Sequence, residues 1–240
     1  MILHESGYRV RHGKWVPHDL SAAQKKSRYE YALELERRHR NHPFLDRLIT
    51  CDETWIPLDN RRPSKQCLRL TQKSKVTPKV GLHPNEVMLC VWWRKYGIIH
   101  WELAENRQTI DAELYYSQLE HISEKICEAE LRGLYRKGPI LQQDNARPHV
   151  AQCTLDKIES LGWELLPHPS YSPDAAPSDY YLFSSLKCYL TGKRFFNVAE
   201  VKSMLSQYFD SKSPAFYRHG IDKLPEKRRS IIVSNGDYFD

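Results

Sequence analysis

No apolar run in this sequence approaches the roughly 18 residues that a membrane-spanning helix needs, which argues against a transmembrane protein. The first residues, MILHESGYRVRHG, lack the charged and then apolar pattern of a secretory signal peptide. Low-complexity tracts are also missing, and hydrophobic residues make up 40% of the chain. A chain of 240 residues with this composition predicts a folded domain with a sizeable core.

The cysteines form no CxxC pair, and no spacing between cysteine and histidine indicates a zinc site. We therefore expect reduced thiols in an intracellular protein. Cys51 and Cys90 lie in apolar runs and are expected in the core. The six cysteines are Cys51, Cys67, Cys90, Cys127, Cys153 and Cys188.

Positive charge is in moderate excess and is concentrated in one segment. The net charge is +6, which suggests an anionic partner without identifying it. Residues 60–80 hold seven lysines and arginines and no acidic residue. Such a run is often a solvated loop. Its length, its single sign of charge and its place after an expected strand favour contact with phosphates.

Apolar periodicity and stop signals predict a mixed succession of helices and strands. Ser21 and Ser178 are expected to begin helices, and a short turn at 95–97 is expected to join two strands into a hairpin. Helices are expected at 21–40, 111–132, 151–162, 178–192, 197–211 and 214–232. Strands are expected at 47–59, 86–94, 97–104, 139–144 and 163–169.

That order fits a ribonuclease H-like α/β domain, in which helices flank a mixed five-stranded sheet. We expect an extended linker over 1–20 and the domain over 21–240, with residues 60–80 as a long basic loop after the first strand. The first and fourth strands would then be neighbours at the sheet centre. Trp92 and Trp93 alternate along their strand, so one is expected in the core and the other to cover the sheet or touch a partner.

Three aspartates stand in settings that suit phosphoryl chemistry. Asp52 ends the apolar run of RLITCDETW, Asp144 ends that of PILQQDNARPH, and Asp179 lies near a helix start in YSPDAAPSDYYLF. The spacer between Asp144 and Asp179 is 34 residues (179 − 144 − 1). Two carboxylates at strand ends and one at a helix start are what a pair of divalent metal ions needs, since Mg²⁺ takes oxygen ligands. A capping role is the alternative for Asp179.

These motifs resemble those of the mariner family of transposases, within the Tc1/mariner group. WVPHDL (15–20) resembles the family's linker motif WVPHEL, and YSPDAAPSDYYLF resembles YSPDLAPSDYHLF. The 34-residue spacer is also typical of the family, and the resemblance runs from about Tyr8 to the last residues. Two features differ. The family's pair of N-terminal helix-turn-helix modules has no counterpart here, and Gln143 precedes the second aspartate where His is common.

The resemblance implies a nuclear DNA transposase with two Mg²⁺ ions per active site, for which Mn²⁺ can substitute. It would cut double-stranded DNA at transposon ends and join the 3′-hydroxyl to target DNA at TA. Asp52 would be shared between the metals, while Asp144 and Asp179 would each hold one. Without helix-turn-helix modules, recognition of specific transposon ends is expected to be weak.

The resemblance also implies a homodimer in which the linker contacts residues 60–80 of a second subunit. The alternative is a linker that docks on its own domain. The linker residues expected at the dimer contact are Trp15, Val16, Pro17 and His18. The residues expected to contact DNA are Arg61, Arg62, Lys65, Arg69, Arg147 and His149.

Two further carboxylates lie close in sequence to residues of the triad. Glu53 follows Asp52 on a strand and points to the opposite face, so we expect it to be structural or to support a metal ligand. Asp174 is a rival third ligand, but its spacer of 29 residues from Asp144 (174 − 144 − 1) does not match the family.

Four polar residues follow the second aspartate or lie near the third. Asn145 and Arg147 either contact a phosphate or shape the turn. His149 is expected to support a metal ligand or to contact DNA, rather than to bind a metal. His168 is expected near the site, with a role in the turn as the alternative.

Two other functions are compatible with the sequence. One is a domesticated DNA-binding or scaffold protein descended from a transposase, against which the three intact aspartates argue. The other is a ribonuclease H-like nuclease that hydrolyses without joining. The WVPHDL linker and the basic loop argue against that, because a simple hydrolase needs neither.

Overall fold

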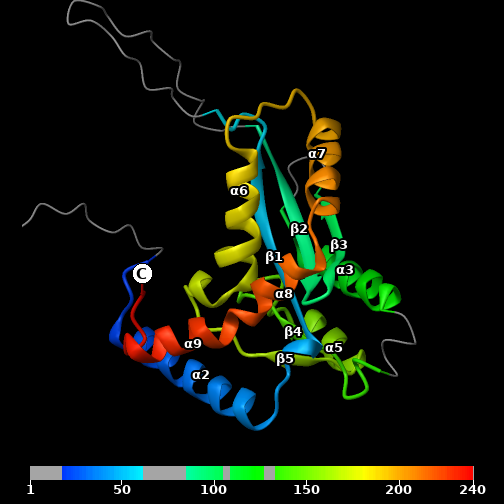
Figure 1. The fold of residues 1–240 in the computed structure, drawn as a ribbon. Helices are drawn as coiled ribbons and strands as arrows, with labels where there is room; N and C mark the ends of the chain where they lie inside the picture. Colours follow the sequence, from blue (N-terminus) through cyan, green and yellow to red (C-terminus); the bar gives the residue numbers. More distant parts are fainter. Residues whose placement is uncertain (1–17, 62–84, 105–108, 127–132, 240) are drawn as a thin grey trace, which may run out of the picture.

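The structure is a computed structural model that describes residues 18–61, 85–104, 109–126 and 133–239 (Figure 1). Residues 1–17 of the predicted linker, most of the predicted basic loop and the end of the predicted helix 111–132 therefore lie outside the described residues. Within the described ranges, no helix combines the length and the apolar character needed to cross a membrane.

A mixed five-stranded sheet with strand order β3-β2-β1-β4-β5 forms the centre. β1 pairs antiparallel with β2 and parallel with β4, so the first and fourth strands are neighbours, as predicted. β4 and β5 are shorter than the predicted strands, and Asp144 therefore lies two residues beyond the end of β4. The strands are β1 (Leu48–Pro57), β2 (Glu86–Arg94), β3 (Gly97–Leu103), β4 (Ile140–Gln142) and β5 (Glu164–Leu166).

Helices cover both faces of the sheet (Figure 1). α2 and α9 lie side by side below it, and α6 runs along β1. The helices are α2 (Ala22–Asn41), η1 (Leu45–Arg47), α3 (Ala112–Lys125), α5 (Gln152–Ser160), η3 (Pro173–Ala175), η4 (Ser178–Phe183), α6 (Ser184–Leu190), α7 (Val198–Asp210), α8 (Pro214–Asp222) and α9 (Leu224–Val233).

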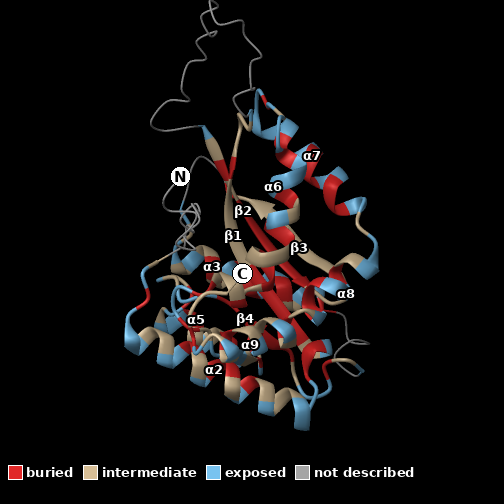
Figure 2. Ribbon diagram, turned by 60° about the vertical axis from the view of Figure 1, so that its left-hand side comes forward, coloured by how far each residue is buried: buried red, intermediate tan, exposed pale blue. Residues whose placement is uncertain are grey.

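Two hydrophobic cores lie on opposite faces of the sheet. Figure 2 colours the ribbon by how far each residue is buried. The larger core contains Trp93 and is completed by α2, α6, α7, α8 and α9. The smaller one contains Trp92 and is completed by α3 and α5. Both tryptophans are fully buried, so the expectation that only one lies in the core is wrong. Because helices cover both sheet faces, alternation along β2 buries both side chains.

The two predicted helix starts have different outcomes. Ser21 caps α2 as predicted, in a reciprocal capping box with Gln24. Ser178 makes no capping hydrogen bond. It begins η4, a six-residue π-helical turn, and its buried hydroxyl accepts a hydrogen bond from the indole Nε1 of Trp93 at 3.0 Å. The capping interpretation of Ser178 was therefore wrong.

The predicted helix at 214–232 is two helices, α8 and α9, which meet at Lys223. Pro225 lies in the first turn of α9. Proline has no N–H group to donate to the carbonyl four residues earlier, so α8 cannot continue through it. The second helix is thereby free to turn and pack along α2 (Figure 1).

Candidate metal-ion site

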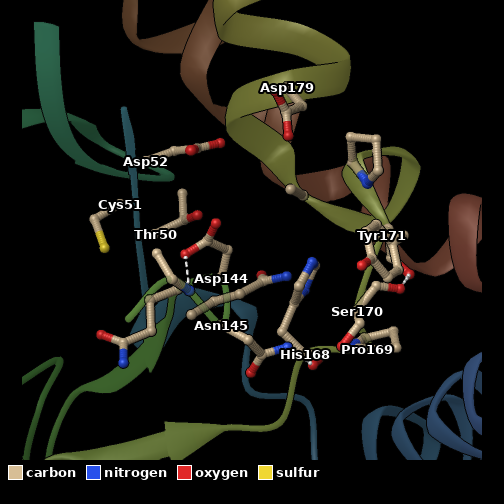
Figure 3. A pocket seen from close by; sticks show the side chains of 16 residues that line it. Thr50, Cys51, Asp52, Asp144, Asn145, His168, Pro169, Ser170, Tyr171 and Asp179 are labelled. Carbon is tan, nitrogen blue, oxygen red and sulfur yellow. Dashed lines mark hydrogen bonds between the residues drawn. The ribbon is translucent and has the colours of Figure 1, made fainter. Parts of the chain in front are cut away.

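The three aspartates of the predicted triad line one pocket of about 410 Å³, and Figure 3 shows their carboxylates around it. Asp52 projects from β1, Asp144 follows β4 and Asp179 lies in η4. Thr50 of β1 pairs with Gln142 of β4 in the parallel ladder, and each aspartate lies two residues further along its own chain. The register of the sheet thus brings Asp52 and Asp144 to the same edge.

Two of these carboxylates resist ionisation. Burial raises the pKa of Asp52 well above its usual range, and the negative charges of Asp179 and Glu53 raise it further. Burial also raises the pKa of Asp179 to about 6, with Lys187 opposing the shift and Asp144 adding to it. Because like charges gather in a partly desolvated pocket, a bound cation or proton would stabilise this arrangement.

Asp144 differs because it has hydrogen-bond donors. His149 Nδ1 lies 2.6 Å from its Oδ1, and the N–H group of Ala146 donates to the same oxygen at 2.9 Å. Burial acts to raise the pKa of Asp144, but these donors bring it below its usual range. Burial acts to lower the pKa of His149, yet the carboxylates of Asp144 and Glu53 raise it to about 10.

The burial of His149 distinguishes between the two roles expected for it, which are support of a metal ligand and contact with DNA. Its side chain is 1% exposed, so the structure favours support of Asp144 over contact with DNA. Its Nε2 lies 3.5 Å from Oε1 of Glu53, which comes from the opposite face of β1 to Asp52. The support expected of Glu53 for a metal ligand is therefore indirect, through this imidazole.

The donor set suits a hard divalent cation, because the three converging groups are carboxylates and Thr50 and Gln142 add polar atoms to the pocket wall. Across the described ranges, no three carboxylate, imidazole or thiol groups already stand close enough to form a metal site.

The remaining polar residues of the pocket shape its wall. The side-chain amide of Asn145 donates to the carbonyl of His168 at 2.7 Å, which supports its role in the turn. His168 lines the pocket, and burial lowers its pKa to about 4, so the ring is neutral. Asp174, the rival third ligand, instead binds the buried guanidinium of Arg28. Asp174 therefore does not compete with Asp179 for a metal.

The residues expected to contact DNA are only partly described. Arg147 is exposed on the turn after Asp144. Arg61 is also exposed, and its Nε lies 2.8 Å from Oδ1 of Asp59. The guanidinium of Arg61 is the main cause that lowers the pKa of Asp59 to about 2. The other three predicted contacts lie outside the described residues, and they are Arg62, Lys65 and Arg69.

Of the linker residues expected at a dimer contact, only His18 is described. Its ring stacks on Tyr171 of the same chain, with ring centroids 3.9 Å apart and an interplanar angle of 15°. Tyr171 lines the candidate metal pocket. This contact favours the alternative in which the end of the linker docks on its own domain.

Sequence reasoning missed the buried partners behind the second aspartate. The hydroxyl of Tyr115 on α3 donates to Oε1 of Gln143 at 2.6 Å. The Tyr115 ring also lies 4.2 Å, centroid to centroid, from that of His149. The helical period of apolar residues places Tyr115 in the core, but no signal in the sequence identifies the residue on which its hydroxyl acts.

Comparison with known proteins places this chain in a family. Residues 58–135 match the family described as "Transposase (partial DDE domain)". The chain is 44% identical over 227 residues to the histone-lysine N-methyltransferase SETMAR of Homo sapiens, across 95% of this chain and 33% of that protein. It is 36% identical over 247 residues to the mariner Mos1 transposase of Drosophila mauritiana, across 99% of this chain and 69% of that protein. The chain thus spans about a third of the first relative and about two thirds of the second.

Solved structures agree with the fold. The catalytic domain of Mos1 mariner transposase matches with a TM-score of 0.78 at 36% identity, over 94% of this chain and 100% of that one. The Mos1 mariner paired end complex with Mn matches with a TM-score of 0.91 at 36% identity, over 100% of this chain and 70% of that one. These similarities confirm the ribonuclease H-like α/β fold predicted from the order of elements. The chain belongs to the mariner family of transposases.

Proposed function

We propose that this chain is the catalytic domain of a mariner-type transposase, which cleaves DNA at transposon ends and joins the 3′-hydroxyl to target DNA at TA. The observation that carries the proposal is the shared pocket of Asp52, Asp144 and Asp179 in a chain of this family. The raised pKa values of Asp52 and Asp179 add support, because they mark carboxylates whose negative charge the surrounding protein does not fully neutralise.

Asp52, Asp144 and Asp179 would hold two Mg²⁺ ions, with Mn²⁺ able to replace them. Such ions activate water or a 3′-hydroxyl for in-line attack and stabilise the leaving oxygen. Mos1 paired end complexes have been solved with Mn and with Mg, which is consistent with this choice. In this chain, His149 and Ala146 would hold Asp144 in place, and the exposed Arg147 would contact a phosphate beside the pocket.

The partner would be double-stranded DNA in the nucleus, bound as a homodimer. Solved Mos1 relatives include a paired-end complex with the left transposon end, which supports a DNA partner. The net charge of +6 and the seven cations of residues 60–80 suit a polyanion. Residues 15–20 would contact residues 60–80 of the second subunit, although His18 stacks within its own chain.

A second candidate is a DNA-binding scaffold that no longer transposes. One observation favours it. The segment 44% identical to this chain forms 33% of a human protein named for histone-lysine methylation, so a domain of this kind occurs in a protein named for other chemistry. The intact Asp52, Asp144 and Asp179 favour the enzyme.

Incubation with supercoiled plasmid separates the two candidates. We expect nicking with Mg²⁺ or Mn²⁺, none with EDTA, and loss of nicking in Asp52→Asn, Asp144→Asn and Asp179→Asn. Asp156→Asn is the matched control, because Asp156 is an exposed carboxylate on α5. A folded wild-type protein that binds duplex DNA but leaves the plasmid closed with both metals would favour the scaffold.

The joining step has its own assay, which does not depend on recognition of transposon ends. An oligonucleotide duplex with a free 3′-hydroxyl is offered together with a target plasmid, and the junctions are sequenced. We expect junctions at TA. Hydrolysis without any junction would instead indicate a simple nuclease, and junctions without sequence preference would contradict the choice of TA.

A further inference from the structure

The two oxygens of the Asp144 carboxylate have different surroundings. Both hydrogen-bond donors near this side chain, His149 Nδ1 and the N–H group of Ala146, reach Oδ1. In the described part of the chain, no donor is found on Oδ2. The carboxylate is thus held by one oxygen while the other stays available at the pocket, where Asp144 lies among the lining residues (Figure 3).

The imidazole that holds Asp144 is itself held from behind by Glu53. Nε2 of His149 lies 3.5 Å from Oε1 of Glu53, a distance typical of an ion pair. Within the described ranges this buried oxygen has no hydrogen-bond donor, so the imidazole is its charge partner. Glu53 is adjacent to Asp52 but faces the other side of β1, and His149 therefore links that face to the pocket edge.

Three further side chains fix the position of the imidazole. The Gln143 amide Nε2 donates to the carbonyl of His149 at 2.9 Å, and its Oε1 accepts from the hydroxyl of Tyr115 at 2.6 Å. The thiol of Cys51 lies 3.1 Å from the same hydroxyl. The Tyr115 ring packs on the imidazole. Gln143, which stands where the family commonly has His, thus has a tethering role behind the site and is 4% exposed.

We propose that Glu53 and His149 form a positioning pair for Asp144, which fixes Oδ1 and presents Oδ2 to a divalent cation. The proposal rests on the proposed function only in requiring that a cation binds at Asp144. Neither residue of the pair touches the cation or DNA. Partners of this kind orient a ligand before the ion arrives, and their loss typically weakens metal affinity roughly 10–100-fold.

Two substitutions of His149 separate its two contacts. In His149→Asn the amide nitrogen takes the place of Nδ1, so the hydrogen bond to Asp144 is kept and the contact with Glu53 is lost. In His149→Gln the amide nitrogen takes the place of Nε2, so the contact with Glu53 is kept and Asp144 is released. Both replacements are polar and smaller than an imidazole, which makes them a matched pair for a buried site.

The measurement is the affinity of the DNA-free protein for Mn²⁺, from titration calorimetry and the electron paramagnetic resonance signal of the bound ion. We expect His149→Asn to bind within a few-fold of wild type and His149→Gln to bind roughly 10–100-fold more weakly. Glu53→Gln is expected to weaken binding by a few-fold, as His149→Asn does, because both variants keep the hydrogen bond to Asp144 and lose the charged contact with Glu53. His219→Gln, an exposed substitution on α8, is expected to bind like wild type.

Equal Mn²⁺ affinities of folded His149→Asn and His149→Gln would overturn the positioning pair and leave the proposed function intact. If His149→Gln does not fold, Glu53→Gln decides, and an unchanged affinity there would overturn the pair. A wild-type protein that binds no Mn²⁺ would overturn both the pair and the metal site of the proposed function.

Discussion

Arg28 and Asp174 form a bidentate ion pair between α2 and η3, with Nη1–Oδ1 and Nη2–Oδ2 distances of 2.7 and 2.6 Å. The Arg28 side chain is fully buried and also donates to Ser172 Oγ and to the carbonyl of Gly236, each at 2.7 Å. One guanidinium therefore connects α2, the loop before η4 and the end of the chain. That loop includes Tyr171, which lines the pocket, so this pair supports the site from outside it.

Arg28→Ala is expected to reduce the free energy of unfolding by about 3–5 kcal/mol, because it leaves Asp174 without its partner in a mostly buried position. Urea denaturation at neutral pH measures the loss. Lys26→Ala is the control on the same helix, since Lys26 forms only an exposed ion pair with Glu30 at 3.8 Å. That change is expected to cost less than about 0.5 kcal/mol. Equal losses would show that the buried pair contributes no more than a surface one.

The pocket should make stability depend on pH. Asp179 has a folded-state pKa of about 6, above the ~3.9 of an unfolded aspartate, so the unfolded chain releases its proton first. Without metal, Asp179 should therefore lower the stability as the pH rises from about 4 through 6, by up to about 3 kcal/mol. Asp179→Asn removes this ionisable group. The free energy of unfolding of the variant should therefore exceed that of wild type by a margin that grows as the pH rises from about 4 through 6.

Urea denaturation in EDTA at pH 4, 5, 6 and 7 tests this dependence. Asp156→Asn, on the exposed side of α5, should give a curve parallel to wild type. If the free energy of unfolding of Asp179→Asn also changes with pH in parallel with wild type, the ionised carboxylate of Asp179 is not destabilised in the folded protein.

Ser178→Ala should destabilise the protein by about 1–3 kcal/mol, because it leaves the buried indole N–H of Trp93 without an acceptor. Ser184→Ala, at an exposed position of α6, should change the stability by less than about 0.5 kcal/mol. Thermal and urea unfolding of both variants give the comparison. A loss confined to Ser184→Ala would contradict the importance of the indole contact.

Removal of four cations from the predicted basic loop should weaken DNA binding and flatten its dependence on salt. Each phosphate contact contributes about 0.9 to the slope of log K against log salt concentration, so the slope should fall by up to about four. The variant combines Arg61→Ala, Arg62→Ala, Lys65→Ala and Arg69→Ala. The control removes the same charge elsewhere, by Lys26→Ala, Arg37→Ala, Arg40→Ala and Lys137→Ala.

Fluorescence anisotropy over a series of salt concentrations measures the slope, and light scattering measures the oligomeric state. An unchanged slope would mean that the loop does not touch DNA. A loss of dimer with an unchanged slope would favour the contact between subunits over the contact with phosphates.

The sequence predicted the features that depend on local pattern. Periodicity located the strands and most helices, and the fold that their order resembles implied that β1 and β4 are neighbours. The apolar runs that end near Asp52 and Asp144 placed both residues at one sheet edge. The N-cap role of Ser21 was also predicted, because a cap acts on the residues that directly follow it; the reciprocal bond from Gln24 was not predicted.

The features that the sequence did not predict depend on contacts across the fold. Ser178 resembles a cap in sequence, but the indole of Trp93, 85 residues away along the chain, uses its hydroxyl. The role of Glu53 depends on His149 reaching across from the turn after β4. Such pairings have no local signature, since they arise only when the elements pack.

The π-helical turn η4 affects the direction in which Asp179 points. The spacer of 34 residues fixes how far Asp179 lies from Asp144 along the chain. It does not fix the direction in which the side chain points from its helix. One residue more or fewer turns the chain by about 100° in an α-helix. Removing one residue between Tyr180 and Phe183 would convert the wide turn into a regular one and swing Asp179 around the axis, relative to the buried Leu186 and Leu190 of α6. The direction in which the third carboxylate points therefore depends on this π-helical turn.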